Sequence, residues 1–109
     1  MPTPENAIKN NILSWLKSKR IFAWPCDSIG IFDPTKKIYR KRHSQYHLKG
    51  VSDILGIYNG KFLAIEVKSK TGRLSPEQVW FLAEVKAKGG IAFMARSIED
   101  CEKNIQIHP

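Results

Sequence analysis

The chain has 109 residues, of which 42% are hydrophobic and 26% charged, a composition that is typical of a folded globular protein and excludes a disordered or membrane-embedded chain. At this length we expect one domain, residues 1–109, with no independent second module. The 18 Lys and Arg residues against 10 Asp and Glu residues give a net charge of +8, which favours a polyanionic partner such as nucleic acid.

Neither a membrane span nor a structural zinc site is predicted. No apolar run approaches the roughly 20 residues that cross a bilayer, and the N-terminal sequence MPTPENAIKN lacks the basic and apolar regions of a signal peptide. We therefore expect a cytoplasmic protein with no membrane partner. Cys26 and Cys101 have no second Cys or His at zinc-site spacing, so we expect two reduced, partly buried thiols.

The first predicted element is a helix that runs from Pro4 to about Ser18. Thr3 suits the N-cap and Pro4 the first helical position. Apolar residues then recur at helical spacing: Ile8, Ile12, Trp15 and Leu16. The next segment, residues 21–47, contains the strand-like runs IFAWP, IGIF and KIYRK, with the turn signal DPTKK before the last of them.

A basic segment without any acid lies between Asp33 and Asp53. It holds six cations, Lys36, Lys37, Arg40, Lys41, Arg42 and Lys49, with two Tyr and two His residues interleaved. A solvated charged face and a nucleic-acid surface both fit such a run. We take Arg40, Lys41, Arg42 and Lys49 as candidate DNA contacts and leave His43 and His47 out of the catalytic set.

Two strand-like runs, VSDILGIY and KFLAIEVK, are joined by Asn59-Gly60. This dipeptide supplies the two positive φ angles of a type I′ hairpin turn. A two-residue loop there pairs Tyr58 with Lys61, and the same register places Asp53 directly across from Glu66. Opposed like charges on one sheet face are destabilising unless something compensates, and a divalent cation is the obvious compensator.

A second helix, a strand and a last helix follow the hairpin. Ser75, Pro76 and Gln78 form an N-cap, a first-turn proline and a capping box, and the helix that they open ends at Gly89-Gly90. IAFMA reads as a buried strand, and Ser97 caps the short final helix. The whole order predicts an α/β fold: a mixed β-sheet flanked by α-helices.

The candidate site is completed by side-chain alternation along the second hairpin strand. Lys68 shares the face of Asp53 and Glu66, whereas Leu63, Ile65 and Val67 point the other way. Hard oxygen ligands suit Mg²⁺ or Mn²⁺, and the backbone carbonyl of Val67 is a plausible further ligand. The ion would polarise a phosphate and activate a water, and Lys68 would orient that water, stabilise the developing charge or act as a base.

Two further polar residues are candidates for the site. Gln78 follows the helical face of Phe81, Leu82 and Val85 that packs on the sheet, although the capping box alone would also explain it. Glu5 is in line with Ile8 on the first helix, yet an acid in a first turn is ordinarily a partner of the helix dipole.

The ordered motifs of the chain resemble those of the VRR-NUC domain, the virus-type replication and repair nucleases of the PD-(D/E)xK superfamily. They are G-V-S-D at 50–53, E-V-K at 66–68, R-L-S-P-E-Q at 73–78 and G-G-I-A at 89–92. The resemblance implies a restriction-endonuclease-like fold and a metal-dependent nuclease. Stand-alone members are associated with bacterial and phage genomes and with branched or flapped DNA, and are often homodimers.

Position by position, the resemblance assigns metal-binding roles to Asp53 and Glu66, the catalytic lysine to Lys68 and the motif glutamine to Gln78. Glu5 matches the acid of the N-terminal helix only loosely. Ser52 stands where the superfamily name has Pro, a position that binds no metal.

Residues around the site extend the hypothesis to DNA and to a second subunit. Lys70 and Arg73 follow the active strand, where the DNA backbone must pass. Trp80 lies about 200° round the helix from Gln78, so an exposed indole there would suit a subunit interface. A homodimer would also supply the two symmetric cuts that a four-way junction requires.

The function that we predict is a Mg²⁺- or Mn²⁺-dependent DNA endonuclease acting on branched DNA such as four-way junctions or flaps. Two alternatives remain open. One is a non-catalytic DNA-binding or scaffold domain with the same fold, and the other is a sequence-specific restriction-type enzyme, for whose base-reading module the chain is short.

Overall fold

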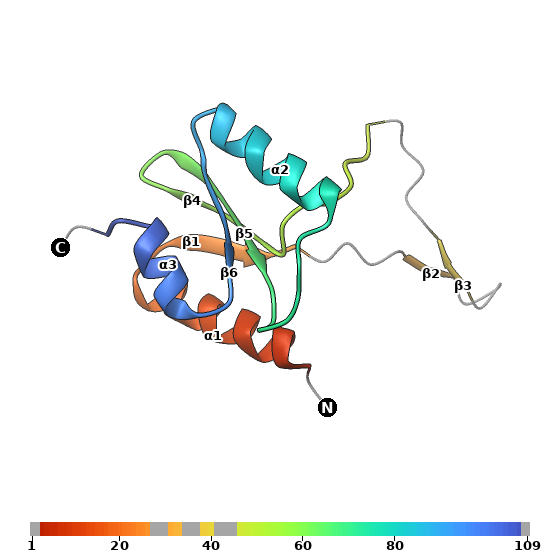
Figure 1. Ribbon diagram of the computed structural model, residues 1–109, viewed down its shortest axis with the longest axis horizontal. Helices are drawn as coiled ribbons and strands as arrows, with labels where there is room; N and C mark the ends of the chain where they lie inside the picture. Colours follow the sequence, from red (N-terminus) through yellow and green to blue (C-terminus); the bar gives the residue numbers. More distant parts are fainter. Residues whose placement is uncertain (1–2, 27–30, 34–37, 41–45, 108–109) are drawn as a thin grey trace.

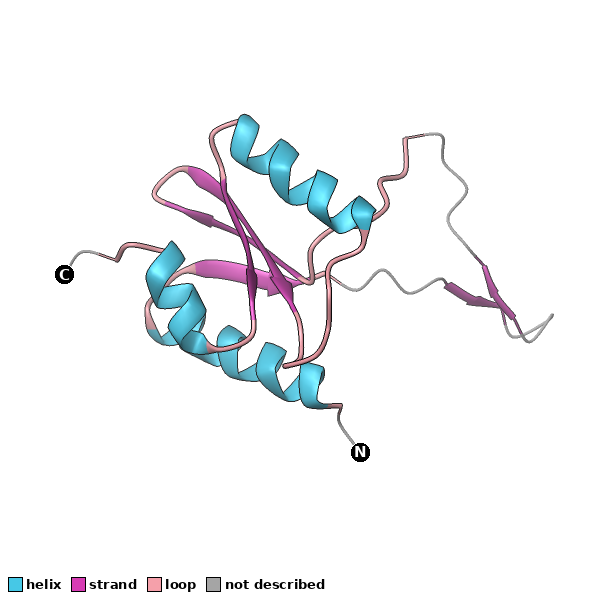
Figure 2. Ribbon diagram, in the orientation of Figure 1, coloured by secondary structure: helices cyan, strands magenta, loops and turns pink. Residues whose placement is uncertain are grey.

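A four-stranded mixed sheet lies between two layers of helix (Figures 1 and 2). The computed structural model of the chain describes residues 3–26, 31–33, 38–40 and 46–107, and for 31–33 and 38–40 it describes the backbone alone. The mixed sheet with flanking helices confirms the predicted α/β class. Among the described residues, no helix is both long and apolar enough to cross a membrane.

The sheet has the strand order β1-β4-β5-β6. Its strands are β1 (Phe22–Pro25), β4 (Ile54–Tyr58), β5 (Lys61–Val67) and β6 (Ile91–Ala95). The pairs β1–β4 and β4–β5 are antiparallel, whereas β5–β6 is parallel. A parallel neighbour needs a crossover connection, and helix α2 (Pro76–Ala87) provides it.

The β4–β5 hairpin has the predicted turn and register. Asn59 and Gly60 have φ angles of 50° and 77°, the two positive values that a type I′ turn demands. Tyr58 pairs with Lys61, and the ladder continues to the pair of Ile54 and Ile65. Side chains on these strands therefore fall on the faces that the sequence predicted.

One face of the sheet is covered by α1 (Pro4–Ser18) and α3 (Ile98–Asn104), the other by α2 (Figure 2). The Thr3 hydroxyl caps α1 by accepting the Asn6 N–H at 3.1 Å, as predicted. The larger core packs Leu63, Ile65 and Val67 against α1 and α3. The smaller core packs Ala64 and Ala92 against α2 residues Phe81 and Leu82.

The described part of residues 21–47 contains three short strands, where the sequence showed strand-like runs. IFAWP contains β1, while β2 (Ile31–Asp33) and β3 (Ile38–Arg40) make a separate two-stranded antiparallel sheet (Figure 1). Of the basic segment, residues 34–37 and 41–45 lie outside the described residues. The DNA contacts predicted for Lys41 and Arg42 therefore remain predictions. The contact predicted for Arg40 also remains one, because only its backbone is described.

Candidate functional site

Asp53 is fixed at the point where the hairpin strands end. It lies one position before β4, beyond the last ladder pair, in the register that opposes it to Glu66. Its Oδ2 accepts the backbone N–H of Val67 at 2.9 Å, and its carbonyl accepts the N–H of Cys26 at 2.7 Å. The backbone of β5 thus holds the Asp53 carboxylate, and the backbone of Cys26 holds the main chain of Asp53.

Glu66 is almost fully buried, with 2% of its surface exposed. Its Oε1 accepts a 2.9 Å hydrogen bond from Nε2 of Gln78 and lies 3.7 Å from Nζ of Lys68. Its Oε2 is buried without a hydrogen-bond partner among the described residues. A buried carboxylate oxygen left in this way is costly unless a proton or a cation satisfies it.

The pKa of Glu66 is raised from 4.5 to about 8. Burial is the largest cause, followed by the negative charge and the closeness of the Asp53 carboxyl group, while the charge of Lys68 lowers the pKa. Without a cation, the Glu66 carboxyl group therefore favours its protonated form at neutral pH. A divalent cation would replace that proton and allow Glu66 to ionise.

Gln78 completes the capping box at the start of α2 and also contacts Glu66. Its Oε1 accepts the N–H of Ser75 at 2.9 Å and its own N–H donates to the Ser75 hydroxyl at 3.2 Å, which completes the capping box. Its Nε2 remains available and donates to Glu66. The start of α2 is thereby connected directly to the buried acid.

Lys68 is held by the segments on either side of it. Its backbone N–H donates to the carbonyl of Ala95 at 3.0 Å, and its side chain is 13% exposed. Gly72 lies close to the Lys68 side chain, since a Cβ on Gly72 would be 3.3 Å from Cδ of Lys68. The amine therefore lies at the mouth of the site, between buried Glu66 and solvent.

Arg96 is a residue of the site region that the sequence analysis missed. Its guanidinium donates to the carbonyl of Ser69, directly after Lys68, and its backbone N–H donates to Oδ2 of Asp100 at 2.8 Å. Its position after the buried run IAFMA was a signal, because the ends of parallel neighbouring strands meet at one edge of a sheet. The contact ties the loop after Lys68 to β6.

The backbone around Gly50 explains why the G-V-S-D motif begins with glycine. Its φ of 80° favours glycine, and a Cβ at this position would lie 2.4 Å from the backbone carbon of Glu77. The segment that leads to Asp53 therefore packs directly on the first turn of α2. Ser52, between them, is fully buried, and its hydroxyl has no hydrogen-bond partner in the described part of the chain.

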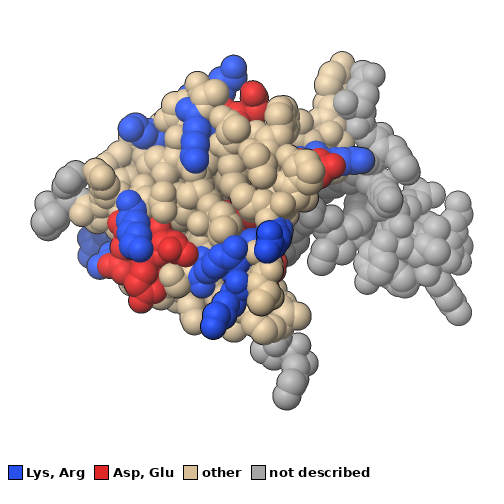
Figure 3. Space-filling view, viewed as in Figure 1, with Lys and Arg blue, Asp and Glu red and all other residues tan. Residues whose placement is uncertain are grey.

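The other residues predicted for the site or its surroundings are half-buried or exposed. Glu5 is half-buried in the first turn of α1, and its catalytic role stays a prediction. Lys49, Lys70 and Arg73 are exposed, and Figure 3 shows Lys and Arg side chains gathered over the loop after β5. Trp80 is 49% exposed on α2, so its indole lies at the surface as predicted.

The donor set fits a hard divalent cation of the magnesium type. In the described ranges no group of three or more His, Cys, Asp and Glu side chains is placed to hold a metal ion, so the acidic donors available at this site are the pair Asp53 and Glu66. Mg²⁺ characteristically uses one or two carboxylates and completes its coordination with water and substrate phosphate oxygens. The buried, unpaired Oε2 of Glu66 agrees with this requirement.

The fold and the site together define an α/β domain in which buried Glu66 lies between half-buried Asp53, Lys68 and the amide of Gln78 on α2. A family model described as the VRR-NUC domain matches residues 4–99. Because the match covers most of the 109 residues, the chain belongs to the VRR-NUC family and is a nuclease-type domain, which implies DNA as its substrate. A search of curated proteins finds no match.

Proposed function

We propose that the protein is a Mg²⁺- or Mn²⁺-dependent endonuclease that hydrolyses phosphodiester bonds in DNA, with Asp53 and Glu66 as metal ligands. The observation that carries the proposal is the environment of Glu66. A carboxyl group with its pKa raised to about 8 lies beside a second carboxyl group and has one oxygen unpaired. Such an arrangement is unfavourable for packing alone and favourable for binding a cation.

The side chains of the site have distinct tasks in this proposal. Val67 N–H fixes the Asp53 carboxylate and Gln78 fixes that of Glu66, so both ligands are oriented before binding. A bound divalent cation would supply Lewis-acid polarisation of the phosphate and a lower pKa for a coordinated water. Lys68 lies at the mouth of the site, where its ammonium stabilises negative charge on the phosphate or orients the attacking water. The Val67 carbonyl remains our candidate for a further ligand.

We further propose that the substrate is branched DNA and that the active form is a homodimer. Exposed Lys49, Lys70 and Arg73 are available for phosphate contacts that position DNA without reading its sequence. One domain carries one acid pair, so two symmetric cuts in a four-way junction require two copies. The exposed Trp80 indole on α2 offers apolar surface for that contact.

Cleavage of labelled flap, splayed, four-way and linear duplex DNA tests the proposal, with Mg²⁺, with Mn²⁺ and with EDTA. We expect cutting of the branched substrates in either metal, no cutting in EDTA, and loss of cutting but retained binding in Asp53→Asn and Lys68→Ala. A wild-type protein that binds every substrate and cuts none in either metal would point to a non-catalytic DNA-binding domain. Cutting of linear duplex at one sequence would point to a restriction-type enzyme.

A further inference from the structure

An aromatic surface lies on the sheet face that carries the acid pair. Helix α2 packs against β5 and β6, and four large apolar side chains remain exposed on the other strands and at the hairpin end. They are Phe22 at 68%, Trp24 at 36%, Ile57 at 44% and Phe62 at 41% exposure. We call these four residues the aromatic surface.

The register places this surface on the same face as Glu66. Phe22 pairs with Ile57, which pairs with Phe62, so these three side chains form one row across the strands. In the next row, Trp24 pairs with Leu55, whose partner is Ala64 in the core beneath α2. Register partners point to one face and residues two apart share it, so Glu66 follows Ala64 on that face.

The rows lead directly to the acid pair. The hydrogen bond from Cys26 N–H to the Asp53 carbonyl extends the β1–β4 pairing by one residue. Trp24 therefore lies two strand residues from this level, about 7 Å along the strand, and Phe22 about twice as far. The Phe22 and Trp24 ring centroids are 5.2 Å apart and the rings are tilted by 50°, so the two rings form a continuous aromatic pair beside the site.

We propose that the aromatic surface binds unpaired bases of the DNA strand that enters the active site, an inference that rests on the proposed nuclease function. In a duplex the faces of the bases are already stacked on one another, so an exposed protein ring finds a stacking partner only where bases are unpaired. Base–aromatic stacking of this kind is the usual way in which proteins hold single strands. The preferred substrate thus carries unpaired nucleotides next to the phosphate that is cut.

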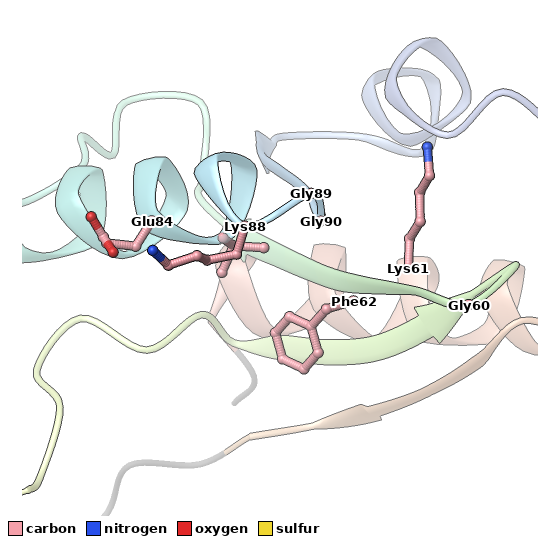
Figure 4. A pocket seen from close by; sticks show the side chains of 8 residues that line it. Gly60, Lys61, Phe62, Glu84, Lys88, Gly89 and Gly90 are labelled. Atoms are coloured by element: carbon pink, nitrogen blue, oxygen red, sulfur yellow. The ribbon is translucent and has the colours of Figure 1, made fainter.

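Charge favours a nucleic-acid strand as the occupant. Lys68 lies at the acid end of the surface. At the other end, Phe62, Lys88 and Glu84 line a hollow of about 350 Å³ beside the hairpin turn, and Figure 4 shows Phe62 and Lys61 projecting from opposite sides of β5. A strand that passes from the hairpin turn to the acid pair thus meets Lys88 at one end and Lys68 at the other, and these cations attract a polyanion.

The test measures binding of splayed-arm DNA and of fully paired duplex of the same sequence by fluorescence anisotropy. An Asp53→Asn background prevents cutting. We expect Trp24→Ala to weaken binding of splayed DNA at least about five-fold, the Phe22→Ala/Trp24→Ala protein to weaken it further, and duplex binding to change little. Val79→Ala is the control, because it removes apolar surface from an exposed α2 residue outside the aromatic surface and should leave splayed-DNA binding unchanged.

Trp24→Leu separates stacking from general apolar contact, since leucine retains apolar area but has no aromatic face. It should weaken splayed-DNA binding as much as Trp24→Ala, and circular dichroism should show both variants folded. Wild-type binding by Trp24→Leu, or a smaller light-scattering mass for the double variant with unchanged DNA binding, would overturn the proposal. Protein that binds splayed DNA through these rings yet cuts no DNA would refute the nuclease function and leave the stacking surface standing.

Discussion

Gln78 donates a hydrogen bond from Nε2 to Oε1 of Glu66 over 2.9 Å. The same side chain accepts the Ser75 N–H at the start of α2. One glutamine therefore caps a helix and orients a buried acid, and the two functions use different atoms of its amide. Because they are separable, each can be removed without the other.

Gln78→Glu should reduce cleavage at least ten-fold while leaving the start of α2 intact. Glutamate is also a good capping-box residue, but its carboxylate donates no hydrogen bond to Glu66 and adds a like charge beside it. Ser75→Ala is the complementary variant. It should lower the free energy of unfolding by about 1 kcal/mol and retain activity, because the Gln78 amide still reaches Glu66. Chemical denaturation and initial cleavage rates measure the two effects, and wild-type cleavage by Gln78→Glu would contradict the role of the amide.

The stability of the metal-free protein should fall as the pH rises through the titration of Glu66. The folded pKa of about 8 is above the ordinary 4.5, so the folded state binds the proton more tightly than the unfolded state. This contribution is fully present below about pH 4.5 and is lost as the pH rises through about 8, a change on the order of a few kcal/mol. Urea unfolding in EDTA between pH 5 and 9 measures the loss.

Glu66→Gln is the control for this pH dependence, because an amide does not titrate in this range. Its unfolding free energy should decline less from pH 5 to pH 9 than that of the wild type. Added Mg²⁺ should restore wild-type stability at pH 9 and have little effect on the variant. Parallel pH profiles for the two proteins in EDTA would show that Glu66 does not titrate as described.

Gly50→Ala should destabilise the protein more than Gly60→Ala. The two glycines have similar φ angles, 80° and 77°, but a Cβ at Gly50 overlaps the backbone of Glu77, whereas a Cβ at Gly60 meets nothing within 4 Å. Gly60→Ala should cost only the strain of an alanine at positive φ, about 1 kcal/mol. Gly50→Ala must also displace the start of α2, at a cost on the order of 3 kcal/mol. Equal losses in thermal or urea unfolding would mean that the packing of Gly50 on α2 contributes nothing.

The features that sequence could predict are the local ones. The Asn59-Gly60 turn admits one register, and side-chain alternation from that register correctly put Glu66 on the face opposite Leu63, Ile65 and Val67. The capping residues Thr3 and Ser75 were predicted correctly because their hydrogen bonds span only three residues. Such features require no knowledge of how distant segments pack.

The features that the sequence analysis missed depend on contacts between distant segments. The hydrogen bond from Arg96 to the Ser69 carbonyl spans 27 residues and exists because β6 lies parallel to β5. The pairing of β1 with β4, which exposes Phe22 and Trp24 beside the acids, depends equally on strand order. The raised pKa of Glu66 depends on its degree of burial. The pattern of residues along the chain determines neither these long-range contacts nor the degree of burial.

The most direct test of the account is calorimetric titration of the DNA-free protein with Mn²⁺ and Mg²⁺ at pH 7, which measures ion binding independently of cleavage. We expect the wild type to bind the ion with release of protons, because ionisation of Glu66 accompanies binding. Asp53→Asn and Glu66→Gln should each bind at least ten-fold more weakly, with less proton release from Glu66→Gln. Wild-type affinity in both variants would contradict the assignment of these two acids as the metal site.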